Sequence, residues 1–124
     1  MLHNSPEIAR GKFRSMGFIF PGRKTQDEGI LISLYDDAMR FEYMVNVGLK
    51  ADGSYATITK TPLVDGSPDD TRGKIVYKGD VIDDGFNSDD YSYLHIKDEK
   101  HGDVILEMSE ACADSPFTLS VETE

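Results

Sequence analysis

Hydrophobic and polar residues alternate along most of this chain with a period of two. In residues 40–47, for example, one face has the side chains Phe41, Tyr43, Val45 and Val47, and the other, mostly polar face has Arg40, Glu42, Met44 and Asn46. A β-strand turns successive side chains to opposite faces, so this pattern predicts strands with one buried face. Eight strands are predicted, over residues 12–20, 30–35, 40–47, 55–61, 74–82, 91–97, 103–108 and 117–121.

Most connections between these segments are short and contain Gly, Pro or Asp, which favour turns. Asp52-Gly53 is one such signal, and residues 62–73 have the composition of a longer loop. Strands joined by short links usually pair with their neighbours in sequence. We therefore predict an all-β fold of about eight antiparallel strands, arranged as a meander-rich barrel or a two-sheet sandwich.

One short helical turn is predicted near the N-terminus, in residues 5–11. Ser5 has a hydroxyl that can cap free helix amides, Pro6 suits the first helical position, and Gly11 can end the turn. A turn this short is stable only when it packs against the rest of the protein.

The length of 124 residues fits a single domain spanning residues 1–124. Lysine and arginine number 13 and aspartate and glutamate 23, so the net charge is −10. The imbalance lies in residues 51–124, which carry 6 basic and 17 acidic side chains. Such a surface repels nucleic acid and anionic membranes and attracts basic proteins, although acidity also serves solubility alone.

Cys112 is the only cysteine, so the chain cannot form an internal disulfide. No apolar run approaches the roughly 20 residues that cross a membrane, and residues 1–12 lack the apolar core of a signal peptide. These features predict a cytoplasmic protein with no membrane contact.

The most distinctive segment runs from Tyr77 to Tyr93 and is predicted to hold a wide acidic loop between two strands. The candidate partner-binding residues in it are Asp80, Asp83, Asp84, Asp89, Asp90, Tyr91 and Tyr93. An EF-hand calcium loop needs oxygen ligands and a glycine at fixed positions, and neither the register that starts at Asp80 nor the one that starts at Asp83 supplies them. Three interpretations remain open: a solvated loop, an irregular calcium site, or a contact surface for a basic partner.

In a meander, alternate loops lie at the same end of the sheet. The loops that contain Asp52, residues 83–90 and residues 110–114 are therefore expected at one rim, with residues 65–70 at the opposite rim. The first rim would be strongly negative and would steer a basic surface into contact, although the basic pair at residues 23–24 dilutes it.

Metal and catalytic sites have weaker signals. Five possible ligands are crowded across one predicted hairpin, but their spacing matches no standard zinc signature: His95, Asp98, Glu99, His101 and Asp103. Cys112 has no sequence cue that ties it to a base, and the chain lacks a phosphate-binding glycine loop and a nucleophile elbow. No catalytic residue, metal ion or cofactor is therefore predicted.

The profile favours a non-catalytic acidic protein-binding module. An inhibitor, or an immunity or anti-defence protein, that docks through acidic loops on a basic nuclease or nucleic-acid-binding enzyme would have these properties. One alternative is a small-molecule-binding β-barrel, because eight strands can enclose one ligand or be filled by side chains. Another is a structural component that assembles through an open edge strand at residues 117–121. An enzyme with an unidentified site is the remaining alternative.

Overall fold

The computed structural model describes residues 7–19, 29–50, 53–84, 93–108 and 114–122, and strands make up most of them. One short 3₁₀ helix, η1 (Asp70–Arg72), lies among them. The strands are β1 (Glu7–Ile19), β2 (Gly29–Asp36), β3 (Phe41–Lys50), β4 (Gly53–Val64), β5 (Ser67–Pro68), β6 (Lys74–Asp84), β7 (Tyr93–Asp98), β8 (Gly102–Met108) and β9 (Pro116–Glu122).

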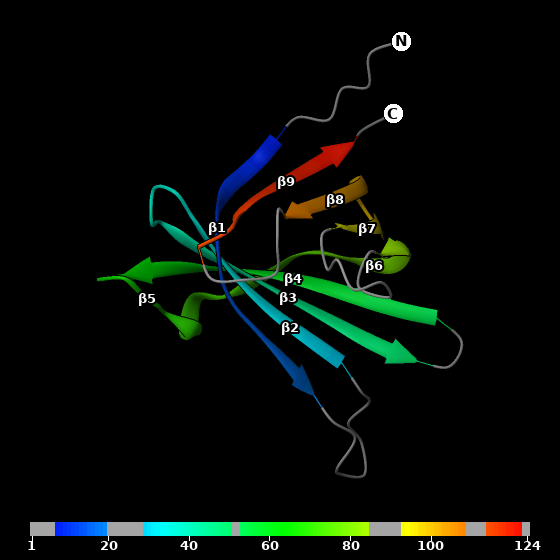
Figure 1. The fold of residues 1–124 in the computed structure, drawn as a ribbon, viewed down its shortest axis with the longest axis horizontal. Coiled ribbons are helices and arrows are strands. Elements are labelled where there is room, and N and C mark those ends of the chain that lie inside the picture. Colours follow the sequence, from blue (N-terminus) through cyan, green and yellow to red (C-terminus); the bar gives the residue numbers. More distant parts are fainter. Residues whose placement is uncertain (1–6, 20–28, 51–52, 85–92, 109–113, 123–124) are drawn as a thin grey trace.

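Eight of the strands close into one antiparallel barrel (Figure 1). Apart from the two-residue β5, which pairs only with the end of β4, each strand pairs with the next along the chain. β1 also pairs with β9, and this pairing closes the ring. The predicted all-β antiparallel meander is confirmed, and of the two predicted architectures the barrel is the one found.

Two strands form the corners of this barrel. β1 pairs with β9 over its first half and with β2 over its second half, and the two ranges overlap around Gly11. β6 pairs first with β4 and then with β7, and these ranges overlap at Gly79. A Cβ on Gly11 would overlap the carbonyl oxygen of Tyr35, and one on Gly79 would overlap that of Lys97. Glycine therefore permits the close backbone approach at both corners.

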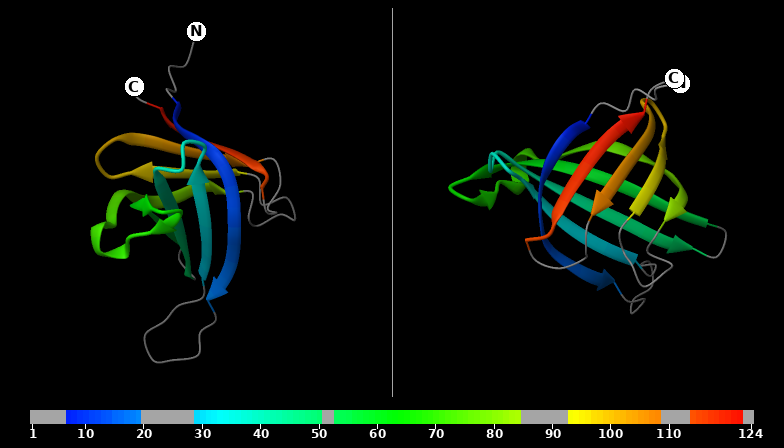
Figure 2. Two further views of the ribbon diagram at one scale, coloured as in Figure 1. Left: turned by 90° about the vertical axis from the view of Figure 1, so that its left-hand side faces the viewer. Right: turned by 45° about the horizontal axis from the view of Figure 1, so that its top comes forward.

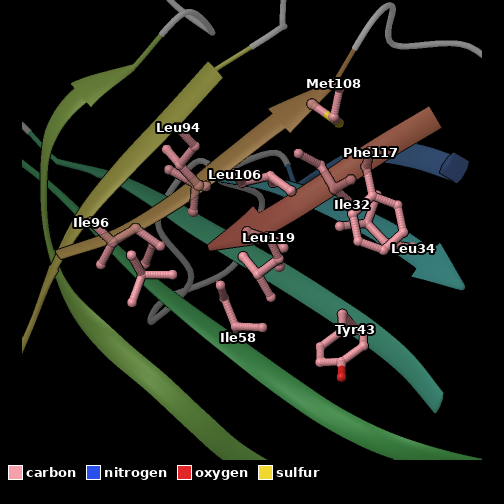
Figure 3. Close-up of a cluster of buried hydrophobic side chains, with 14 of the residues drawn as sticks. Ile32, Leu34, Tyr43, Ile58, Leu94, Ile96, Leu106, Met108, Phe117 and Leu119 are labelled. Atoms are coloured by element: carbon pink, nitrogen blue, oxygen red, sulfur yellow. The ribbon is translucent and has the colours of Figure 1, made fainter. Parts of the chain in front are cut away.

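The corners give the barrel two facing layers, β2–β3–β4 and β7–β8–β9, joined by β1 and β6 (Figure 2). Apolar side chains from both layers fill the space between them (Figure 3). Ile32, Leu34 and Ile58 come from the first layer and Leu94 and Leu119 from the second, and all five have no exposed surface. Side chains thus fill the middle of the barrel, as in other eight-stranded barrels of small diameter.

Two predictions are wrong. The helical turn expected at residues 5–11 is strand from Glu7 onward, because Glu7 pairs with Ser120 and the barrel gains backbone hydrogen bonds that an isolated turn cannot match. Residues 5 and 6 lie outside the described ranges. The segment 117–121 is not an open edge either, since β9 pairs with β1 on one side and β8 on the other.

The meander gives the barrel two ends. We call one the terminal end, because β1 begins there and β9 finishes there; β3 also begins and β4 finishes at it (Figure 2). The strand ends that flank residues 20–28, 51–52, 85–92 and 109–113 lie at the opposite end. Across the described ranges, no helix has the length and apolar character that crossing a membrane requires.

Candidate functional site

The structure describes only some of the acidic residues that were predicted to bind a partner. Asp80 is an exposed residue of β6, and Asp83 and Asp84 extend β6 two residues beyond its predicted end at Ile82, so they are strand rather than loop. The strand continues because residues 83 and 84 pair with His95 and Leu94 of β7. Three further candidates lie outside the described residues: Asp89, Asp90 and Tyr91.

Tyr93 is the first residue of β7 and is half-buried. Leu94 and Ile96 point into the core, so Tyr93 and His95 face outward, as the alternation predicts. The Tyr93 hydroxyl lies 3.5 Å from His95 Nδ1, and His95 Nε2 lies 3.3 Å from an Asp103 carboxylate oxygen. Within the described ranges, no group of three or more His, Cys, Asp or Glu side chains is arranged to hold a metal ion.

The terminal end of the barrel carries two adjoining pockets. The first, the β1 pocket, has a volume of about 350 Å³ and is lined by Glu7, Ile8, Ala9, Arg10, Asp36, Asp37, Ala38, Arg40, Phe41, Tyr43 and Lys60. The second, the β6 pocket, has a volume of about 470 Å³ and is lined by Phe41, Lys60, Pro62, Thr71, Arg72, Lys74 and Val76. Phe41 and Lys60 belong to both, so the two pockets meet at these side chains.

Lys60 lies at the centre of this region because β4 places it on the inner face. Ile58 is fully buried, and Lys60 follows it by two residues and pairs with the buried Tyr43 of β3. Its ammonium group lies 4.1 Å from the ring centre of Phe41 and 5.9 Å from that of Tyr43. A cation held against aromatic faces in this way is favourable and keeps the lysine at the mouth of the barrel.

Lys60 interrupts the apolar row of β4, and this interruption is a sequence signal for the site. In β4 the inward positions run Ala56, Ile58, Lys60, so a charged residue occupies a position where the pattern calls for an apolar one. A lysine at the end of an inward row can keep its methylenes on apolar surface and its charge in water. Such a break in the alternation marks a candidate site at the end of a barrel.

Two tyrosine hydroxyls also belong to this end. Burial raises the pKa of Tyr43, and the negative charge of Asp36 raises it further. Burial likewise raises the pKa of Tyr77, with a second contribution from Asp98. Both phenols therefore stay protonated at neutral pH and can donate hydrogen bonds. Figure 3 shows the Tyr43 hydroxyl pointing away from the apolar cluster.

The buried carboxylates nearby are engaged in holding turns. Asp36 accepts hydrogen bonds from the backbone amides of Arg40 and Phe41, at 2.7 and 2.9 Å, and so fixes the tight turn between β2 and β3. Asp98 does the same between β7 and β8, where it accepts from the amides of Lys100 and His101. Their charges are satisfied by the backbone, so they shape the terminal end without being free to bind a ligand.

Together these groups suit reversible binding. The two pockets offer aromatic and aliphatic walls, ammonium and guanidinium groups, and the phenolic donor of Tyr43, which is the usual mixture of a small-molecule site. Comparison of the chain with protein-family models, with curated proteins and with solved structures finds no match in any of the three.

Proposed function

We propose that this protein is a non-catalytic binding protein that takes up a small molecule at the terminal end of its barrel. The observation that carries the proposal is the pair of pockets that meet at Phe41 and Lys60. Their volumes, about 350 and about 470 Å³, fall in the range of roughly 300–1,000 Å³ typical of ligand sites. A cytoplasmic location is part of the proposal, because a single cysteine fits a reducing compartment.

The filled core supports binding at the mouth rather than at the centre. Ile32, Val45 and Leu106 have no exposed surface, so a ligand in the middle would have to displace well-packed side chains. At the mouth, Phe41 is only half-buried and Lys60 is partly exposed, so a ligand there gains apolar contact without opening the core.

A tryptophan reporter tests this proposal, since the natural chain has no tryptophan. Phe41→Trp places one on the wall shared by the two pockets. We expect compounds that raise the melting temperature to change the emission of this variant. At a hundredfold excess over Kd, a ligand of the folded state stabilises it by about 2.7 kcal/mol, or roughly 10 °C for a chain of this size.

The matched control is Tyr93→Trp, which puts the reporter on the outer face of β7. A compound bound at the mouth leaves the emission of this control unchanged. The proposal fails if stabilising compounds alter both reporters equally, or alter only the control.

A second candidate function, the acidic docking protein predicted from the sequence, is favoured by one observation. The ends of β6 and β7 next to Asp84 and Tyr93 lie at the same barrel end as the strand ends next to residues 51–52 and Asp114. We propose that this end meets a basic protein, such as a nuclease or a nucleic-acid-binding enzyme, that the protein would inhibit or against which it would give immunity. Opposite charge would speed association and set the docking orientation.

Charge reversal tests this second candidate. Lysine at Asp83, Asp84, Asp89 and Asp90 should abolish salt-sensitive capture of a basic partner and any inhibition of it, with the melting temperature little changed. Reversal at three exposed positions of the terminal end, Asp37, Asp65 and Asp70, is the control and should leave capture intact. Inhibition that survives the first set of changes would exclude this docking surface.

A further inference from the structure

We infer that the β6 pocket takes a small organic anion with a flat apolar body, of the class of aromatic carboxylates and sulfonates. This inference rests on the proposed small-molecule function and names the chemistry of the ligand. It assigns the anionic group to Lys60 and Lys74 and the apolar body to the wall formed by Phe41, Pro62 and Val76.

The charge of the pocket is the first reason. Lys60, Arg72 and Lys74 line it, and no carboxylate does. Acidic side chains outnumber basic ones by 23 to 13 in the whole chain, so a pocket lined by three cations and no acid has the opposite charge balance to the chain. Physiological salt screens exposed charges that lie roughly 8 Å or more from the pocket, so the cations that line it weigh most on a ligand bound there.

The pairing of the lysines is the second reason. Lys60 of β4 is the direct cross-strand partner of Lys74 of β6, and like charges placed opposite each other destabilise a sheet. Arg72 has its own counter-charge, since its Nε lies 2.8 Å from an Asp69 carboxylate oxygen. Neither lysine forms an ion pair with any carboxylate of the described ranges. An anion between the two ammonium groups would relieve this repulsion and gain two charge-assisted contacts.

The apolar wall is the third reason, and it separates this ligand from a simple inorganic anion. Phe41 presents an aromatic ring to both pockets, and Pro62 and Val76 extend the apolar surface. A small hydrated ion would leave these side chains in water, whereas a flat organic body would cover them. A neutral compound would cover the wall but leave the two lysines facing each other, and a cation would add to their repulsion.

Two related dyes test the inference with the full-length protein. Anilinonaphthalene sulfonate carries a sulfonate on a flat aromatic body, and N-phenylnaphthylamine is the same body without the charge. We expect the wild-type protein to bind the sulfonate more tightly than the neutral dye. Lys60→Met, which keeps an unbranched apolar side chain, should weaken sulfonate binding about tenfold or more and leave binding of the neutral dye nearly unchanged.

Lys97→Met is the matched control, because Lys97 is an exposed lysine on β7 and does not line the pocket. An equal loss in this variant would mean that the sulfonate follows surface charge, and the inference would be wrong. Neutral dye bound as tightly as the sulfonate by the wild type would also overturn it, while the proposed small-molecule function would stand. Failure of both dyes to bind would contradict the inference, and the tryptophan reporter at position 41 would then decide on the pocket itself.

Discussion

Replacement of Gly79 by alanine should cost the barrel about 3 kcal/mol or more of unfolding free energy and lower its melting temperature by roughly 10 °C. A Cβ at this position would overlap the carbonyl oxygen of Lys97 and crowd the Cα of Asp98, both of which are backbone atoms that cannot rotate away. β7 would have to move away from β6 where β6 passes from one layer to the other. Thermal and urea unfolding followed by circular dichroism measure the loss.

The chain provides a matched control in Gly17, which also lies in a strand. No heavy atom lies within 4 Å of a Cβ built there, so Gly17→Ala should change stability by no more than about 1 kcal/mol and can be stabilising. Gly11→Ala, at the other corner, should be as harmful as Gly79→Ala. If Gly79→Ala were as stable as Gly17→Ala, the close approach of β6 and β7 at this corner would be disproved.

Replacement of Asp98 by alanine is the second large effect expected. The buried carboxylate accepts hydrogen bonds from the amides of Lys78, Lys100 and His101 and lies 2.7 Å from His101 Nδ1. Alanine would leave these groups without their partner, at a cost of about 3 kcal/mol in unfolding free energy. Asp80→Ala, an exposed carboxylate in β6, is the control and should change stability by less than about 0.5 kcal/mol.

The carboxyl group of Asp98 should also make the stability of the fold depend on pH. Burial alone would raise the pKa of Asp98, but hydrogen bonds from Lys78, Lys100 and His101 outweigh it and hold the pKa below the ordinary value of 3.8. The folded state therefore binds this proton less readily than the unfolded chain, so the stabilisation is complete above the ordinary pKa and is lost as the pH falls through the folded-state value.

Melting curves of the wild type and Asp98→Asn, taken from about pH 6 down to about pH 2, measure this contribution. The difference in stability between the two proteins should be constant in the upper part of the range and should shrink below about pH 4. A difference that stayed the same at every pH would show that the carboxylate charge of Asp98 does not stabilise the fold.

The strand positions could be predicted because apolar and polar residues alternate wherever a strand has one face on the core and the other on the outside of the barrel. Ile58, for example, lies between Thr57 and Thr59 because one face of its strand meets the core. Closure of the ring was not predictable in the same way. It depends on Gly11 and Gly79, and in the sequence these look like other glycines because their role comes from a neighbouring strand that is distant along the chain.

The candidate site was harder to predict than the fold. Lys60 lies within β4, Arg72 ends η1 and Lys74 begins β6, so only tertiary structure brings Lys60 to the same pocket as the other two. In the sequence, the many aspartates of residues 77–93 form an obvious cluster, whereas the three cations of the pocket do not stand out in an acidic chain. A local excess of the rarer charge is visible only when residues are placed in space.

The pairing of β1 with β9 also has a consequence for how the chain folds. Glu7 meets Ser120, so the contact that completes the barrel is among the longest in sequence that this chain can make. Hairpins such as β2–β3 and β7–β8 can form early from neighbouring residues, whereas the first half of β1 waits for β9 to leave the ribosome. During that interval its unpaired amides and carbonyls can pair with other chains, so slow synthesis or crowding should increase aggregation of the nascent protein.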